Sequence, residues 1–86
     1  DNPWDNLRYR VGDIVRAKCV SVTGHNWFGK IDGEEIEIYC EFPPVDKNVR
    51  VIVGEEYECH IFRIREKSRL IMAATSRKVE GRPTVN

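Results

Sequence analysis

Two stretches of this chain share one pattern, in which apolar and polar residues alternate behind a glycine and an acidic residue. The stretches are residues 11–23 and 53–64. The small or apolar residues of each stretch fall on one face, and they are Val15, Ala17, Cys19, Tyr57, Cys59 and Ile61. Alternation with a period of two is typical of a strand with one buried and one exposed face. The pattern therefore predicts two half-buried strands, each entered through a glycine turn.

Turn residues divide the rest of the chain into three further extended segments. We expect strands at residues 13–22, 27–31, 35–40, 56–64 and 69–74. Asp32-Gly33 is a strong hairpin signal, Pro43-Pro44 ends the third strand, and an irregular connection leads on to Val53. Five strands with a long third connection predict an all-β fold, the five-stranded antiparallel Greek-key barrel called the OB-fold. This fold binds oligonucleotides and oligosaccharides on its second and third strands.

The length of 86 residues corresponds to one domain with a modest core. We expect a lead-in at residues 1–8, the barrel at residues 9–78 and a flexible tail or linker at residues 79–86. Because the chain begins with Asp1, we expect it to be one part of a longer protein. It contains no apolar run near the ~20 residues that a membrane span needs, so we expect no membrane partner.

Charge is distributed unevenly, although the formal net charge is zero. Residues 32–58 contain nine acids and two bases, a net of −7, while residues 63–78 contain six bases and one acid, a net of +5. Nucleic-acid-binding domains usually carry a net positive charge. The zero net charge of the whole chain therefore argues against RNA binding, whereas the basic segment at residues 63–78 argues for it. The plainer interpretation is that these charges solvate loops and strand edges.

Three cysteines, Cys19, Cys40 and Cys59, are odd in number and form no Cys-x-x-Cys pair. This spacing does not predict a zinc site, and we expect no metal and no cofactor. Cys19 and Cys59 share the apolar faces of their strands, so we expect both to be buried free thiols. Free thiols of this kind are typical of a reducing compartment, and we expect a cytoplasmic protein.

Strand alternation assigns directions to the side chains of the second strand. If Trp27 points into the barrel, Phe28 and Lys30 point outward, and Phe28 stands beside Tyr39 of the next strand. Exposed aromatic rings next to cations are the means by which proteins hold single-stranded RNA. The alternative is that Phe28 packs beneath the 43–48 connection and that Trp27 is the exposed ring.

Several of these segments together resemble a known family, the S-one RNA-binding domain that repeats in bacterial ribosomal protein S-one and occurs in polynucleotide phosphorylase. The resemblance extends from about Tyr9 to Lys78. The segments that carry it are Val11-Gly12-Asp13-Ile14-Val15, His25-Asn26-Trp27-Phe28-Gly29-Lys30-Ile31, Val53-Gly54-Glu55 and Arg69-Leu70-Ile71-Met72. The family's Gly-Ala-Phe-Val is replaced here by Asn26-Trp27-Phe28-Gly29, and its Leu-Ser by Met72-Ala73.

The resemblance implies an RNA-binding face. The family's two aromatic residues on strand two fall on His25 and Phe28, and its aromatic or histidine on strand three falls on Tyr39. Its acid in the final turn is replaced by Arg65, while its arginine at the start of strand five is matched by Arg69. With the basic residues around these positions, the predicted RNA-binding residues are His25, Phe28, Lys30, Tyr39, Arg65, Lys67 and Arg69.

Two functions remain open from the sequence. The first is a single-stranded RNA-binding module, either one domain of a larger RNA-processing, ribosomal or translation protein or a free-standing factor similar to bacterial translation initiation factor one. The second is a protein-interaction barrel without RNA binding, as in the viral decoys of the initiation factor two alpha subunit. No nucleophile motif, glycine-rich phosphate loop or spaced carboxylate pair is present, so we do not expect an enzyme.

Overall fold

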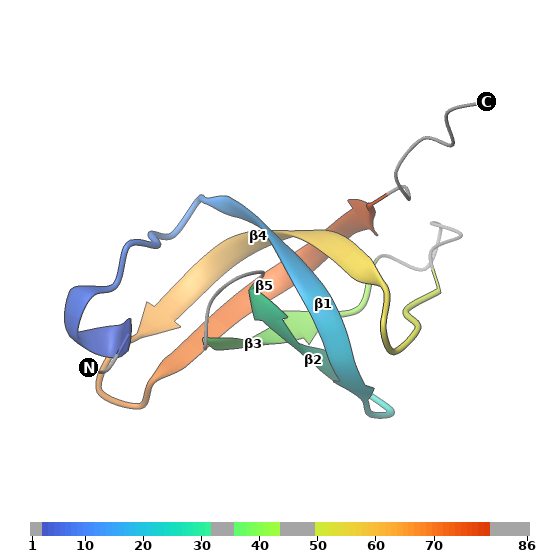
Figure 1. The fold of residues 1–86 in the computed structure, drawn as a ribbon, viewed down its shortest axis with the longest axis horizontal. Coiled ribbons are helices and arrows are strands. Elements are labelled where there is room, and N and C mark those ends of the chain that lie inside the picture. The colour runs from blue at the N-terminus through green and yellow to red at the C-terminus, as the bar shows by residue number, and fades with distance from the viewer. Residues whose placement is uncertain (1–2, 32–35, 44–49, 80–86) are drawn as a thin grey trace.

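Five strands form a closed barrel in the computed structural model, which describes residues 3–31, 36–43 and 50–79 (Figure 1). The elements are the 3-10 helix η1 (Pro3–Asn6) and the strands β1 (Ile14–Val22), β2 (Asn26–Ile31), β3 (Glu37–Glu41), β4 (Glu56–Arg65) and β5 (Leu70–Lys78). Neighbouring strands pair in the order β1-β2-β3-β5-β4, and β4 closes on β1. The all-β class and the five-stranded barrel predicted from the sequence are confirmed.

One of the five strand pairings is parallel, and this detail departs from the predicted antiparallel barrel. The β1–β2, β2–β3, β1–β4 and β4–β5 pairs are antiparallel, whereas β3 and β5 run in the same direction. An odd number of strands cannot alternate in direction around a closed ring, so one neighbouring pair has to be parallel. The parallel pair places β5 beside β3, and this neighbour matters for the site described below.

The barrel is filled by the side chains that the alternation pattern places inward. The buried hydrophobic core consists of Val15, Ala17, Cys19, Trp27, Ile31, Ile36, Ile38, Cys40, Tyr57, Cys59, Ile61, Ile71 and Ala73. Partly buried Trp4, Leu7 and Tyr9 pack against this core, so the described part of the segment before β1 lies on the barrel. The turns before β1 and β4 use Gly12 and Gly54 at φ 101° and 97°, a backbone region that favours glycine.

Strand boundaries differ from the prediction mainly at the C-terminal side. β5 continues four residues beyond the predicted end, because Thr75 turns its side chain into the barrel and is only 4% exposed. The predicted Asp32-Gly33 turn, most of the 43–53 connection and residues 80–86 lie outside the described residues. Among the described residues, no helix is long and apolar enough to cross a membrane.

Candidate nucleic-acid interface

Trp27 anchors β2 inside the barrel and thereby sets the direction of every other side chain on that strand. Its indole is 0% exposed, and its Nε1 donates a hydrogen bond of 2.8 Å to Thr75 Oγ1. The Thr75 hydroxyl in turn donates to the backbone oxygen of Glu41 at 2.6 Å, which ties β2, β3 and β5 together. The ring also packs against Tyr57 at 5.3 Å between centroids. Trp27 is therefore a core residue, and the alternative of an exposed Trp27 is wrong.

Phe28 and Tyr39 form an outward-facing aromatic pair on β2 and β3. They lie directly opposite each other in the antiparallel register, with ring centroids 5.0 Å apart and an interplanar angle of 84°. Both side chains are half-buried, so part of each ring is open to solvent. An edge-to-face pair is a favourable aromatic geometry that leaves one ring face available for stacking. The predicted juxtaposition of these two residues is confirmed.

A hydrogen-bond chain fixes the orientation of the Tyr39 ring. The Asn26 side-chain amide Nδ2 donates to the Tyr39 hydroxyl, and Asn26 Oδ1 lies 2.9 Å from the hydroxyl oxygen of Thr23. The Thr23 oxygen also accepts the backbone N–H groups of His25 at 3.2 Å and Asn26 at 3.0 Å, which holds the β1–β2 turn. Because the Tyr39 hydroxyl oxygen accepts a hydrogen bond from Asn26, the hydroxyl proton points away from Asn26 and can be donated to another acceptor. Sequence reasoning did not select Asn26, although it shares the outward phase of Phe28.

The aromatic pair continues across two more strands. Tyr39 pairs with Met72 in the parallel β3–β5 register, and Met72 pairs with Arg63 in the β4–β5 register. We call Phe28, Tyr39, Met72 and Arg63 the aromatic row, because they lie side by side at right angles to the strands. Met72 is half-buried and Arg63 is exposed. Sequence reasoning missed Met72, since the β3–β5 pairing that brings it to Tyr39 is non-local.

Basic side chains flank the aromatic row on one side. Lys18 of β1 lies opposite Lys30 of β2, and Glu37 of β3 lies on the other side of Lys30. All three side chains are exposed, and neither lysine makes an ion pair with another described residue. Lys18 also has an acid on its other side, because Glu56 of β4 lies opposite it. The two lysines face each other directly and repel, and a bound anion would relieve this repulsion. On β4, Arg65 extends the same side of the row.

The predicted RNA-binding residues fall into separate groups. Phe28, Lys30 and Tyr39 lie together on the β2–β3 face, whereas His25 is exposed in the β1–β2 turn. Arg65 ends β4 and Lys67 lies in the β4–β5 turn. Arg69, which the sequence predicts to begin the fifth strand, lies in the same turn. The predicted residues are therefore spread along the barrel, because the β4–β5 turn lies toward one end of its longest axis and the β1–β2 turn lies well away from it, beyond the middle (Figure 1).

Arg69 occupies an unusual backbone conformation. Its φ is 54°, in the left-handed region, and its N–H donates to the backbone oxygen of Glu66 at 3.1 Å to close the turn. The left-handed region costs a non-glycine residue about 1–2 kcal/mol. Arg69 precedes Met72 by three residues, which corresponds to about 10 Å along an extended strand. The Arg69 side chain is therefore too short to cover the whole distance to the aromatic pair.

The three cysteines are buried free thiols inside the barrel, which confirms the prediction for Cys19 and Cys59 and adds Cys40. Cys40 and Cys59 place their Sγ atoms 3.9 Å apart. The hydrogen bond with Cys59, together with burial, raises the pKa of the Cys40 thiol, and burial also raises the pKa of Cys19. Among the described residues, no group of three His, Cys, Asp or Glu side chains is placed to hold a metal ion.

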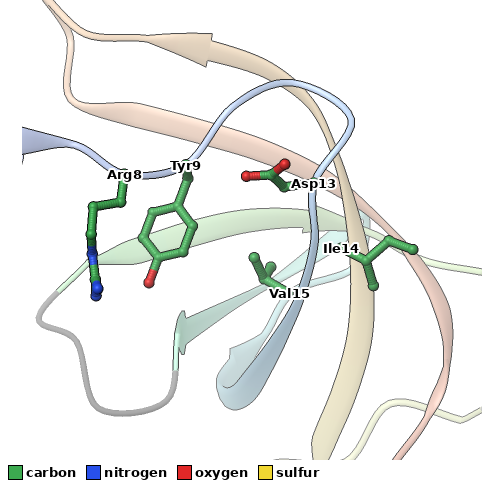
Figure 2. A pocket seen from close by; sticks show the side chains of 5 residues that line it. All are labelled: Arg8, Tyr9, Asp13, Ile14 and Val15. Atoms are coloured by element: carbon green, nitrogen blue, oxygen red, sulfur yellow. The ribbon is translucent and has the colours of Figure 1, made fainter.

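A surface hollow lies apart from the aromatic row, at the start of β1. Figure 2 shows its lining, in which Arg8 and Tyr9 come from the segment before β1 and Asp13, Ile14 and Val15 from around its first residues. The Asp13 carboxylate already accepts the backbone N–H of Arg10 at 2.9 Å. None of the predicted RNA-binding residues lines this hollow, so it adds nothing to the candidate interface.

Comparison with solved structures finds similar barrels. One is a chain from the a/eIF2alpha-aDim2p-rRNA complex of Pyrococcus horikoshii OT3, with a TM-score of 0.67 and 16% identity over 80% of this chain and 45% of that chain. This protein therefore spans under half the length of that chain. Another is an uncharacterized protein from Methanocaldococcus jannaschii, with a TM-score of 0.64 and 16% identity over 78% of this chain and 92% of that one.

A third similar structure is a vaccinia virus protein, with a TM-score of 0.60 and 8% identity over 86% of this chain and 96% of that one. Comparison with models of protein families gives no match, and comparison with curated protein sequences gives none either. At these identities the similarity establishes the barrel fold alone.

Proposed function

We propose that this protein is a single-stranded RNA-binding module that belongs to a larger RNA-processing or translation protein. The observation that carries the proposal is the outward Phe28–Tyr39 pair on β2 and β3, with ring centroids 5.0 Å apart. Aromatic rings on this face of a small barrel are stacking platforms for unpaired bases, and adjacent cations contact the phosphates. Lys18 and Lys30 supply such cations beside Phe28.

The comparison with the Pyrococcus horikoshii structure is consistent with this proposal, because that structure is a complex that contains rRNA. The proposal assigns no reaction to the domain. Its role is to bring RNA to a neighbouring domain or complex, and the zero net charge implies weak binding by the single domain.

Titration with a short mixed-sequence RNA at low salt, followed by NMR, tests the proposal. We expect shifts centred on Phe28 and Tyr39. Phe28→Ala should weaken binding by about 1–3 kcal/mol, since that is the contribution of one stacked base. Phe62→Ala is a matched control, because Phe62 is an aromatic residue on β4 that is 41% exposed and outside the aromatic row. The proposal fails if RNA shifts no signal of the aromatic row, or if both substitutions weaken binding equally.

A second function, binding of a protein partner, is favoured by a different surface. Four aliphatic side chains are exposed on β1 and on the segment before β4, and they are Val20, Val22, Ile52 and Val53 at 48%, 41%, 46% and 57%. The Gly54 N–H donates to the Cys19 backbone oxygen and the Cys19 N–H donates to the Glu55 backbone oxygen, both at 2.9 Å, and these bonds hold the two segments side by side. Contiguous exposed apolar side chains are typical of protein contact sites. If RNA shifts no NMR signal of the aromatic row, we infer instead that the protein binds a protein partner through these aliphatic side chains.

A further inference from the structure

The two sides of the aromatic row carry different charges. On one side lie Lys18, Lys30, Glu37 and, at the end of β4, Arg65, and Glu56 lies opposite Lys18 across the β1–β4 pair, which gives three bases and two acids. On the other side lie Asn26, Glu41, Ala74 and His60, which follow one another in register from β2 to β4. Glu41 is the acid of this second side. The sides are each about 7 Å from the row, because they are two residues away along each strand.

This asymmetry orients a strand of RNA that lies across the sheet. Phosphates carry the negative charge of RNA, and they are attracted to the side with Lys18 and Lys30 and repelled from the side with Glu41. A base that stacks on Phe28 or Tyr39 then directs its hydrogen-bonding edge away from the lysines. That edge meets the groups that β2 and β3 present there, which are Asn26 and Glu41.

Among these groups, the Glu41 carboxylate is the acceptor that makes no hydrogen bond with another residue of the described part of the chain. The Asn26 amide is already engaged at both ends, with the Tyr39 hydroxyl and with Thr23. The Glu41 side chain is exposed and forms no ion pair with another described residue, while its backbone oxygen is fixed by Thr75 at 2.6 Å. A carboxylate on a fixed strand position, two residues from Tyr39, is thus available to a base.

We propose that Glu41 makes this RNA-binding site selective for bases that carry an exocyclic amino group, a proposal that rests on the function proposed above. The 4-amino group of cytosine donates a hydrogen bond to a carboxylate, whereas uracil presents the O4 carbonyl at the same position and is repelled. Tyr39 complements this contact, because its hydroxyl accepts from Asn26 and offers its own proton to an acceptor on the base.

Binding of oligocytidylate and oligouridylate of equal length tests the inference, with fluorescence anisotropy at one fixed salt concentration. The two ligands have the same ring size and backbone and differ at the edge that Glu41 faces. We expect the domain to bind oligocytidylate at least about fivefold more tightly. Glu41→Gln should bring this ratio close to one, because an amide donates to the uracil carbonyl as readily as it accepts from the cytosine amino group.

Glu37→Gln is the matched control. Glu37 is an exposed acid on the same face of β3, but it lies on the lysine side of the aromatic row. Its substitution should tighten binding of both ligands and leave their ratio unchanged, since it removes only a charge that repels phosphate.

Two results overturn the inference while leaving RNA binding intact. One is a wild-type domain that binds both ligands equally or prefers oligouridylate. The other is a Glu41→Gln variant that binds both more tightly at an unchanged ratio, which would mean that Glu41 acts only by repelling phosphate. If neither ligand binds at low salt, the proposed function itself fails, and the inference fails with it.

Discussion

Gly29 lies beneath the Trp27 ring, and replacing it with alanine is expected to destabilise the barrel. A Cβ at this position would lie 2.6 Å from Trp27 Cζ3, 2.8 Å from the backbone oxygen of Lys18 and 3.3 Å from the Ala17 Cβ. The first two distances are too short for real contacts, and neither neighbour moves freely. The Trp27 ring is held by Thr75 and packed against Tyr57, while the Lys18 oxygen belongs to the β1 backbone.

The expected loss follows from two opposing contributions. Overpacking a well-filled core costs about 1–3 kcal/mol, whereas glycine-to-alanine substitution returns about 0.4–1 kcal/mol by restricting the unfolded chain. A net loss of about 1–2 kcal/mol lowers the Tm of a domain of this size by roughly 4–16 °C. Thermal and urea unfolding followed by circular dichroism measure the loss directly.

Two comparisons separate the clash from a general glycine effect. Gly24→Ala should be neutral or slightly stabilising, because a Cβ there meets nothing within 4 Å. In a Trp27→Phe background, the loss caused by Gly29→Ala should shrink, since the smaller ring withdraws the atom nearest the new methyl group. Wild-type stability of Gly29→Ala would refute the reasoning, and so would an equal loss in both backgrounds.

Three other predictions concern the buried Cys40 thiol and Arg69 in the final turn. The folded protein raises the pKa of Cys40 above its ordinary value of 9.0, so the proton stays on the folded chain while the unfolded chain releases it. The contribution of the Cys40 thiol to stability is therefore complete below about pH 9, and above that pH it declines by about 1.4 kcal/mol per pH unit. In urea titrations, the difference in free energy of unfolding between wild type and Cys40→Ala should narrow by this amount as the pH rises. A difference that stays constant from about pH 8 to 10 would contradict this assignment. Arg69→Gly should raise the free energy of unfolding by up to about 1 kcal/mol, because φ is 54° at this residue. If Arg69 contacts one phosphate, the same variant should flatten the salt dependence of RNA binding by about 0.7 in log–log slope, and an unchanged slope would remove Arg69 from the interface.

The sequence predicts the barrel and the Phe28–Tyr39 pair because both depend on local pattern. Alternation along β2 and a short connection to β3 are enough to place two outward rings side by side. Met72 and Arg63 could not be predicted in the same way, because they reach the site through the parallel β3–β5 pairing and a register shift in β4 between Ile61 and Arg63. Such non-local register is set by the packing of the whole barrel.

Thr75 illustrates the same limit from inside the barrel. Its position after an apolar segment and before a run of polar residues predicts the end of a strand. The structure instead buries Thr75 because the Trp27 indole needs an acceptor and the Glu41 carbonyl needs a donor, and one hydroxyl serves both. This requirement becomes visible only when β5 is brought beside β2 and β3, which lie far from it in the sequence.

The closed ring of strands has a consequence for how this domain meets other molecules. Each of the five strands has a hydrogen-bonded neighbour on both sides over part of its length, so none of the described strands is an edge strand from end to end. Barrels of this kind are protected from edge-to-edge polymerisation, and they do not capture peptides by extending a sheet. Copies of such a domain joined in tandem are therefore protected from pairing edge to edge, even at high local concentration.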